Sequence, residues 1–304
     1  MTESIEIAFL GTSAAMPTPD RNLSSIALRF MGDVLLFDAG EGTQRQLMKA
    51  EVSYMKIKHI FISHFHADHF LGLPGMIATM NMLERYEPLH IYGPRGIKLR
   101  VEKALELALM KLDFKIEFHE LKEGKVLEEK NYSVHAFALK HSSACFGFAF
   151  KENDKKGEFM RSKAEQLGIP VGPLYAKLAS GKSVKVNGKT FKPVDVMDYS
   201  KGRSGRKVCI VMDTLASESY AKHLKEADVL VHEAVFASDA EERAKETKHS
   251  TAKQAAQIAS KAKVKKLFLT HISSRYKDAT PLLEEARKEF AHTEIAQDLM
   301  KVKL

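Results

Sequence analysis

Residues 59–69 read HIFISHFHADH, an apolar run of strand type that leads directly into four side chains able to bind a metal ion. In an extended segment, residues two positions apart point the same way, so His64 and His66 can reach one ion. The chain must then turn before Asp68 and His69 can face a second ion. Imidazole nitrogen and carboxylate oxygen both suit Zn²⁺ in sites of the catalytic type. Packing explains four such residues in six positions poorly, so this stretch predicts a metal centre at the end of a buried strand.

Other runs of β type end in the same kinds of residue. YSVHAFALK is followed by His141, VCIVM by Asp213 and KLFLT by His271. Because α/β proteins place their sites where strand ends converge on one rim of a sheet, we expect these residues to join the first four. The expected grouping is His64, His66 and His141 in one site, Asp68, His69 and His271 in a second, and Asp213 as a bridge. Such paired ions can hold a shared hydroxide and suit hydrolysis of either phosphodiesters or amides.

Short β-rich runs alternate with stretches of helical pattern along the chain. The expected strands cover 5–10, 24–30, 34–40, 59–63, 132–139, 208–213, 228–233 and 266–271. Several are almost continuously apolar, which is typical of strands covered on both faces. The expected helices cover 94–112, 250–263 and 280–290, and Pro281 suits the first turn of the last one. This alternation predicts an α/β fold with sheets inside and helices outside.

Residues 151–195 break the alternation, because they are rich in Gly, Pro and Lys. We expect that this segment carries too little apolar surface to form a core of its own. The segment is interpreted as an excursion inserted within a single domain that spans residues 1–304. A plain surface insertion is the alternative interpretation from the residues alone.

The composition of the 304 residues sets broad limits. A net charge of +8 and an isoelectric point near 9.2 favour polyanionic partners, although the signal is weak alone. Cys145 and Cys209 are too few for a disulfide framework and indicate buried thiols in a reducing cytosol. The start, MTESIEIAFLGTS, lacks the order of a secretory signal, and no apolar run reaches membrane-spanning length. We therefore expect a soluble cytoplasmic protein.

These motifs carry a resemblance to a known family. HFHADH followed by separated His, Asp and His resembles the metallo-β-lactamase superfamily. More narrowly, residues from about 5 to 276 resemble the ribonuclease Z family, the tRNA 3′-processing endoribonucleases, in its short form. The specific motifs are GEGTQRQ (40–46), GIPVGPLY (168–175) and HISSRY (271–276). The resemblance implies a four-layer αββα sandwich with a protruding flexible arm.

The resemblance also implies a set of site residues. Two Zn²⁺ ions per subunit are expected, with the ligands His64, His66, Asp68, His69, His141, Asp213 and His271. Asp68 is expected to act also as the proton acceptor for the attacking water, and His249, with Glu233 near it, as the proton donor to the leaving oxygen. From its position after His271, we expect Arg275 to hold a substrate phosphate, with a surface salt bridge as the alternative. His232 follows an apolar strand and is interpreted as a hydrogen-bonded inner histidine.

The function implied is a zinc-dependent endoribonuclease that removes the 3′ trailer from precursor tRNA, leaving a 3′-hydroxyl on the tRNA and a 5′-phosphate on the trailer. Residues 151–195 would form a tRNA-binding arm, and a homodimer is implied in which each arm serves the other subunit's active site. The arm has the charge to follow a phosphate backbone through Lys177, Lys182, Lys185, Lys189 and Lys192. One alternative is a small-molecule thioester or lactone hydrolase of the same fold, which has no use for a basic arm. Another is a non-catalytic tRNA-binding module, which would have been expected to lose ligands.

Overall fold

The computed structural model describes residues 4–304 and divides the chain into two compact units. The larger unit comprises the chain up to Glu128, Ser133–Phe150 and Lys207–Leu304, and the smaller one comprises Glu129–Tyr132 and Lys151–Arg206. The first three residues of the N-terminal stretch considered above lie outside the described residues. None of the helices found in residues 4–304 has the length and hydropathy needed to cross a bilayer.

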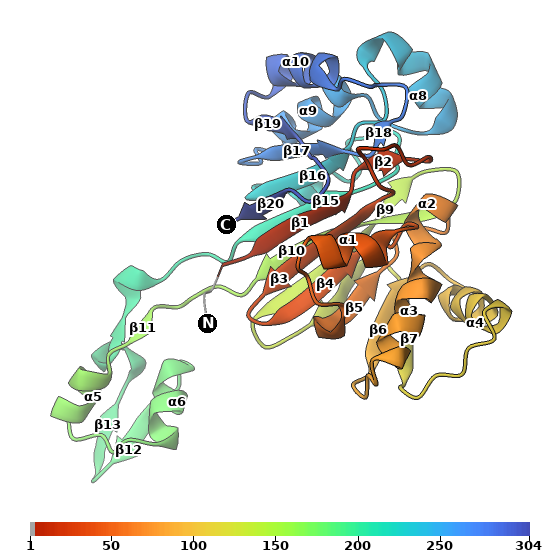
Figure 1. The fold of residues 1–304 in the computed structure, drawn as a ribbon. Coiled ribbons are helices and arrows are strands. Elements are labelled where there is room, and N and C mark those ends of the chain that lie inside the picture. Colours follow the sequence, from red (N-terminus) through yellow and green to blue (C-terminus); the bar gives the residue numbers. More distant parts are fainter. Residues whose placement is uncertain (1–3) are drawn as a thin grey trace. The chain divides into compact units, whose positions relative to one another are not determined.

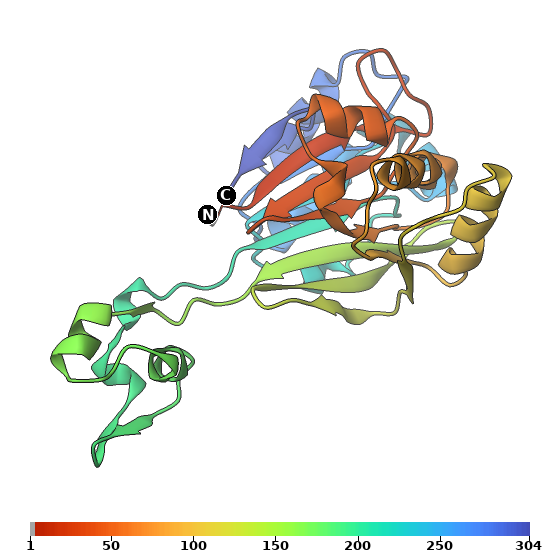
Figure 2. The same cartoon turned by 60° about the horizontal axis from the view of Figure 1, so that its bottom comes forward.

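The larger unit is built on two sheets that face each other (Figures 1 and 2), each with seven strands among residues 4–304. In spatial order, the first contains β20 (Lys301–Lys303), β1 (Glu6–Gly11), β3 (Ser25–Phe30), β4 (Asp33–Phe37), β5 (Ile57–Phe61), β6 (Leu89–Gly93) and β7 (Ile116–Glu120). The second contains β19 (Thr293–Ile295), β17 (Leu267–Thr270), β16 (Val229–Glu233), β15 (Lys207–Val211), β10 (Ala144–Glu152), β9 (Tyr132–Lys140) and β8 (Gly124–Glu128). A short pair joins β2 (Ser13–Ala14) to β18 (Ile272–Ser273).

Strands β4 to β7 run parallel to one another, as do β15, β16, β17 and β19. Parallel neighbours have their carboxyl ends at the same edge, which is where open α/β sheets form their sites. The register therefore places the polar residues that follow these strands together, as the sequence predicts.

Helices cover the outer face of each sheet, so the order of layers is helix, sheet, sheet, helix, as predicted (Figure 1). The first sheet is covered by α1 (Thr43–Lys49), α3 (Gly72–Met82) and α4 (Ile97–Leu107), and the second by α9 (Ala252–Lys261) and α10 (Thr280–Glu289). Short helices are α2 (Ala67–Phe70), α7 (Ala221–Leu224), α8 (Glu241–Thr247) and the 3₁₀ turns η1 (Tyr54–Lys56) and η4 (Ser238–Ala240). The predicted Pro281 lies in the first turn of α10.

Strand β17 shows why its sequence, LFLT, is apolar throughout. Phe268 points into the space between the sheets, where its ring centroid lies 5.4 Å from that of Phe9 in β1. Leu267 and Leu269 alternate with it and pack against α9 in a second buried cluster. With both faces covered, every position of the strand is buried. Further aromatic contacts between the sheets join Phe30 to Phe150 and Phe37 to Phe148.

The smaller unit contains its own elements and its own core. It is made of β11 (Glu158–Phe159), α5 (Arg161–Gln166), α6 (Pro173–Ala179), β12 (Val184–Val186), β13 (Lys189–Phe191), η2 (Pro193–Asp195), β14 (Met197–Asp198) and η3 (Tyr199–Lys201). The buried cluster consists of Ala164, Ile169, Leu178, Val184, Phe191 and Val196. The expectation that this segment lacks a core is therefore wrong. Its buried apolar residues are few, but α5, α6, β12 and β13 each contribute one, and Ile169 and Val196 come from the connecting segments.

The base of the smaller unit is held by a buried carboxylate. Glu152 is 3% exposed and accepts hydrogen bonds from Arg203 at 2.6 and 2.7 Å and from the Arg206 guanidinium at 2.8 and 3.1 Å. The backbone nitrogen of Glu152 also donates to the carbonyl of Arg206. The chain entering the unit is thus joined to the chain leaving it, and the unit continues to Arg206, beyond the predicted limit at residue 195.

Candidate metal centre and active site

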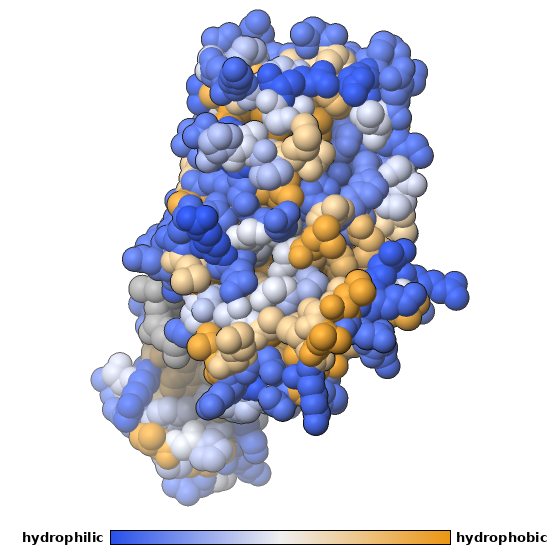
Figure 3. Space-filling view, turned by 45° about the vertical axis from the view of Figure 1, so that its right-hand side comes forward, coloured by the Kyte–Doolittle hydropathy of each residue, from blue (hydrophilic) through white to orange (hydrophobic). Residues whose placement is uncertain are grey.

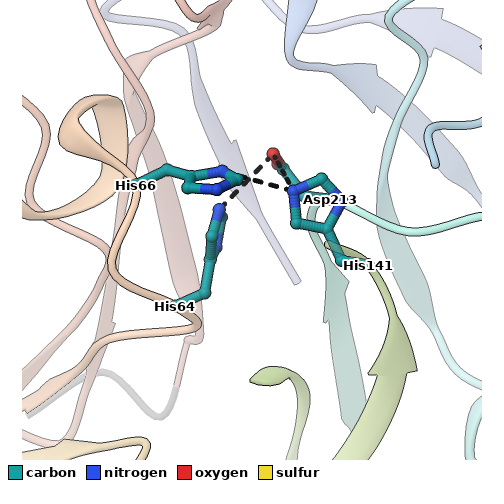
Figure 4. A group of neighbouring side chains, drawn as sticks. All are labelled: His64, His66, His141 and Asp213. Carbon is teal, nitrogen blue, oxygen red and sulfur yellow. Dashed lines mark hydrogen bonds and ion pairs between the residues drawn. The ribbon is translucent and has the colours of Figure 1, made fainter. Parts of the chain in front are cut away.

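The structure brings the seven predicted ligands together at the carboxyl ends of four strands. His64 follows β5, His141 follows β9, Asp213 follows β15 and His271 follows β17. Figure 4 shows His64, His66, His141 and Asp213 pointing toward a common point from different elements. Their ligand atoms all lie within 4.8 Å of one another, and the same holds for Asp68, His69 and His271.

In the first cluster, the imidazoles approach one oxygen of Asp213. Nε2 of His64 lies 3.5 Å from Oδ2 of Asp213, and Nε2 of His141 lies 3.6 Å from the same oxygen. His66 completes the group, with its Nδ1 3.2 Å from Nε2 of His141. His66 is exposed at the N-terminus of α2, whereas His64 and Asp213 are buried.

The second cluster approaches the other oxygen of Asp213. Nε2 of His69 and Nε2 of His271 lie 3.2 and 3.3 Å from Oδ1 of Asp213 and 3.1 Å from each other. Oδ2 of Asp68 lies 3.3 Å from Nε2 of His271 and accepts a 2.9 Å hydrogen bond from the backbone of Ala15. Asp213 therefore stands between the two clusters, with one oxygen toward each.

The chemistry of this donor set fits divalent metal ions. Nε2 of His64 and Oδ1 of Asp213 are buried and have no hydrogen-bond partner among residues 4–304. Buried polar atoms without partners are rare in proteins, and here they converge with other imidazole and carboxylate groups. Burial, reinforced by the neighbouring His69, lowers the pKa of His64 to about 2. His64 is therefore neutral at physiological pH, the form in which imidazole binds metals.

Hydrogen bonds to the other ring nitrogens fix the orientation of three of these histidines. Nδ1 of His69 donates to Oδ2 of Asp38 at 2.7 Å, and Nδ1 of His141 donates to the carbonyl of Lys248 at 3.0 Å. Nδ1 of His64 lies 3.0 Å from the hydroxyl of Ser63, which in turn donates to Asp38. Such contacts keep the opposite nitrogen directed at a metal position.

Asp38 is a site residue to which the sequence prediction gave no role. It follows β4 and accepts the backbone N–H of Ser63 at 2.7 Å in addition to the bonds from His69 and the Ser63 hydroxyl. The signal was present, because VLLF followed by Asp38 repeats the pattern of the other strand ends. Asp38 and His271 also have φ of 58° and 56°, the left-handed region. Such residues cost about 1–3 kcal/mol each and cluster at functional sites.

A pocket of ≈ 240 Å³ opens over the second cluster. Asp68, Asp213 and His271 form part of its lining, together with His249 and Arg275. The Arg275 guanidinium is exposed and lies 4.8 Å from the ring centroid of Phe236. It forms no ion pair with any residue in the part of the chain that the structure describes, so the alternative of a surface salt bridge is not found. A bound anion can therefore approach this guanidinium.

His249 and His232 lie on either side of Glu233 and have different surroundings. Nδ1 of His249 lies 3.0 Å from Oε1 of Glu233, and Nε2 lies 4.0 Å from Oδ2 of Asp213. His232 is buried, donates from Nδ1 to the Glu233 carbonyl at 2.7 Å, and contacts the Tyr220 hydroxyl at 2.9 Å. The interpretation of His232 as a hydrogen-bonded inner histidine is confirmed.

Comparison with known proteins identifies the family. Ribonuclease Z of Methanosarcina mazei is 44% identical over 99% of this chain and 98% of its own length. Ribonuclease Z of Archaeoglobus fulgidus is 46% identical over 98% of this chain and 97% of its own length. The chain belongs to the ribonuclease Z family. The relatives therefore span the smaller unit as well as both sheets, as the resemblance implied.

Solved structures agree with this membership. The short form of human tRNase Z is similar with a TM-score of 0.72 and 30% identity, covering 98% of each chain. The metallo-β-lactamase fold protein YhfI from Bacillus subtilis has a TM-score of 0.71 over 100% of both chains, at 16% identity, and supports the fold alone. The family model described as Anti-Pycsar protein Apyc1 matches residues 5–160. That half of the chain includes His141 but ends before Asp213 and His271.

The structure also explains part of the ribonuclease Z motif GEGTQRQ. A Cβ on Gly40 would lie 2.3 Å from the backbone oxygen of Asp68, so only glycine allows this close approach beside the metal centre. Gln46 donates from Nε2 to the Leu10 carbonyl at 2.7 Å and to Asp298 at 2.8 Å. The motif therefore contributes to the packing and hydrogen bonding of the backbone around the site. It supplies no ligand to the two clusters.

Proposed function

We propose that this chain is an endoribonuclease that hydrolyses the phosphodiester bond at the 3′ boundary of precursor tRNA. The products would be a tRNA with a 3′-hydroxyl and a trailer with a 5′-phosphate. The observation that carries the proposal is full-length similarity to ribonuclease Z proteins, in a chain whose fold brings two clusters of imidazole and carboxylate groups together at the strand ends. The name of the human relative, tRNase Z, supports tRNA as the substrate class.

The metal ions are proposed to be two Zn²⁺ per chain. His64, His66 and His141 would hold one, Asp68, His69 and His271 the other, and Asp213 would contribute to both. A donor set of imidazole and carboxylate without cysteine is typical of catalytic zinc. When bound, the ions would supply Lewis-acid stabilisation of the charge that develops on the phosphate oxygens.

The protein side chains would then position the reaction and move protons. Asp68 lines the pocket and would accept a proton from the attacking water. His249, held by Glu233, would donate a proton to the departing ribose oxygen. Arg275, which has no carboxylate partner among residues 4–304, would hold a substrate phosphate through its planar fork of N–H groups.

The smaller unit is proposed to bind the tRNA. Lys177, Lys182, Lys185, Lys189 and Lys192 are all exposed on it. Lysine contacts with phosphate groups do not depend on base sequence. These side chains are therefore suited to binding the phosphate backbone of many different tRNAs. Replacing all five by Gln is expected to weaken precursor tRNA binding and to reduce its dependence on salt concentration. An unchanged affinity and salt dependence would rule out this role.

A homodimer is also proposed, in which each subunit's smaller unit serves the active site of the other. Large apolar side chains are exposed on the face formed by α1, α3 and α4, and Figure 3 shows orange apolar surface gathered on this side. They include Met48, Leu71, Met82, Leu83, Tyr86, Leu99, Leu107 and Leu109. Contiguous apolar surface of this kind is typical of interfaces. Sedimentation of the purified protein tests the proposal, and a monomer at micromolar concentration would refute it.

A cytoplasmic location is proposed from the expected substrate and from the state of the cysteines. Precursor tRNA is the expected substrate, and Cys145 and Cys209 are both buried and unpaired. Fractionation of cells that produce the protein at its native level would test this location.

The deciding experiment compares three substrates with the zinc-loaded protein. They are a 3′-extended precursor tRNA, an unstructured RNA of equal length, and a panel of chromogenic thioesters and lactones. A single cut at the tRNA 3′ boundary, lost with chelator and restored by zinc, is expected. Ester turnover without RNA cleavage would assign the chain to the small-molecule hydrolases, and tRNA binding without any turnover to the non-catalytic modules.

A further inference from the structure

A third group of potential ligands lies on β6 and β7, outside the seven residues of the metal centre. Nδ1 of His90 lies 3.2 Å from Nε2 of His119 and 3.4 Å from Oε2 of Glu117. All three ligand atoms lie within 4.8 Å of one another. The side chains of His90 and Glu117 are 23% and 32% exposed, so an ion from solvent can reach them.

The sheet register produces this arrangement. In the parallel pair of β6 and β7, His90 is the partner of Glu117, and Tyr92 is the partner of His119. Glu117 and His119 are two positions apart on one strand, so their side chains project from the same face. Because β7 is the last strand of the first sheet, this face lies at a sheet edge, where ordered backbone sets the spacing of the ligands.

The spacing matches what a zinc ion requires. Four tetrahedral ligands at about 2.0–2.2 Å from Zn²⁺ lie about 3.3–3.6 Å from one another. In this group the separations from Nδ1 of His90 are 3.2 and 3.4 Å. In the candidate metal centre, corresponding separations are 3.1 Å for His69 to His271 and 3.5 Å for His64 to Asp213. The two separations from His90 are therefore similar to those between proposed ligands in the candidate metal centre.

Neighbouring side chains hold the three ligands in this orientation. The Tyr92 ring stacks on His119 with centroids 4.4 Å apart, and the His59 ring stacks on His90 at 5.2 Å. Lys115 binds Oε1 of Glu117 at 2.6 Å, which leaves Oε2 directed at His90. Such supporting contacts are a regular part of metal sites in proteins.

We propose that His90, Glu117 and His119 form a Zn²⁺ site distinct from the catalytic pair. Two imidazoles and one carboxylate oxygen would provide three ligands. A water from the adjoining surface pocket, which is lined by Tyr92, His119 and Val126 among others, would provide the fourth. The ion would join edge strand β7 to β6 across the connection that contains α4, and so stabilise the edge of the first sheet. This site does not depend on the proposed catalytic function.

The first test counts zinc. Purified protein is stripped with chelator, dialysed against micromolar Zn²⁺ and measured for bound metal. Wild type is expected to retain one zinc per chain more than the double variant His90→Phe/His119→Phe, whose rings preserve the stacking on His59 and Tyr92. Glu102→Gln is the control, because Glu102 is exposed on α4, where it lies 3.7 Å from Lys98 and outside the proposed site. Equal zinc content in wild type and the double variant would overturn the proposal.

A second test removes ligands of the catalytic ions instead. It does not depend on the folding of the His90→Phe/His119→Phe variant. In a chain carrying His64→Ala, His69→Ala and Asp213→Ala, which keeps only two ligands in each catalytic cluster, Co²⁺ is expected to bind with a ratio of one per chain and to produce visible d–d absorption. Zn²⁺ is expected to displace it and to raise the thermal midpoint. The absence of both the absorption and the shift in midpoint would exclude the site. Failure of RNA cleavage in wild type would contradict the proposed function only, since neither measurement uses RNA.

Discussion

Nδ1 of His249 lies 3.0 Å from Oε1 of Glu233, whose side chain is fully buried, while Nε2 of His249 lies 4.0 Å from Oδ2 of Asp213. Burial lowers the pKa of His249, but the charge and hydrogen bond of Glu233, together with the charge of Asp213, outweigh it and raise that pKa to about 9. Below this pH the ring carries a proton on Nε2, on the side of the metal centre. The pair therefore has the geometry and charge of a general acid.

The substitution Glu233→Gln is expected to lower the pKa of His249 toward its ordinary value of 6.5. A raised pKa means that the protonated form is present below it and lost above it, so the alkaline fall in cleavage rate should begin near pH 9 in wild type. In the variant this fall should begin at a lower pH. Single-turnover cleavage of precursor tRNA across a pH series measures both profiles. An identical alkaline limb in the two proteins would remove Glu233 from this role.

The metal centre was predictable because its signal is local in the sequence. An apolar strand followed at once by an imidazole or carboxylate recurs at His64, Asp213 and His271, and parallel pairing brings such ends to one rim. Residues that meet in one cluster can, however, lie far apart in the sequence. His69 and His271 are 202 positions apart, and only the fold or a family resemblance tells which histidine joins which.

Two parts of the structure could not be predicted from the pattern. Strand β7, IEFHE, has polar residues at alternate positions and is only partly buried, and the buried strand β6, LHIYG, is short and interrupted by His90, so neither matches a continuous apolar run. The core of the smaller unit depends on residues as far apart as Ala164 and Val196, each isolated among polar neighbours. In both cases burial results from tertiary contacts that no short window of sequence contains.

Replacement of Asp68 by Asn is expected to reduce cleavage by about 10²–10⁴-fold, the range typical of a lost proton acceptor. Burial raises the pKa of Asp68, but hydrogen bonds from His271 and His69 outweigh it and keep the group ionised. Because the substitution keeps the size of the side chain, precursor tRNA affinity should remain at the wild-type value. Single-turnover rates and a binding titration separate the two effects. The exposed Asp239→Asn is the control, and wild-type cleavage by Asp68→Asn would show that the proposed role is wrong.

The substitution Asp38→Asn tests a residue that forms a hydrogen bond with the proposed ligand His69 and belongs to neither ligand cluster. Its carboxylate accepts from Nδ1 of His69 at 2.7 Å and so fixes the tautomer that presents Nε2 to the second cluster. An amide in its place can offer an N–H to the same nitrogen and favour the other tautomer. Zinc affinity is expected to fall by about 10–100-fold. Competition with a chromophoric chelator measures this change, and excess zinc should restore part of the cleavage rate. A variant with unchanged zinc affinity would contradict the inference.

The substitution Glu152→Gln tests the base of the smaller unit. Burial raises the pKa of Glu152, but hydrogen bonds from Arg203 and Arg206 outweigh it and hold that pKa at about 2. Because the folded pKa is depressed below 4.5, the ion pairs stabilise the unit above that pH and lose their effect as pH falls toward 2. The variant should open locally with a free energy lower by about 1.5–3 kcal/mol, the range for a hydrogen bond to a charged group.

Hydrogen exchange at neutral pH measures this opening at the backbone amides of residues 152, 155, 203 and 206, which join the two chain segments. The matched control is Glu158→Gln, which removes an exposed ion pair with Lys201 between the same two segments. Exposed pairs contribute little, so the control should exchange at the wild-type rate. Faster exchange in Glu152→Gln alone, with a higher KM for precursor tRNA and an unchanged kcat, would show that a firm base is needed for substrate binding. Equal exchange rates in both variants would show that backbone hydrogen bonds, and not the Glu152 ion pairs, stabilise the base of the smaller unit.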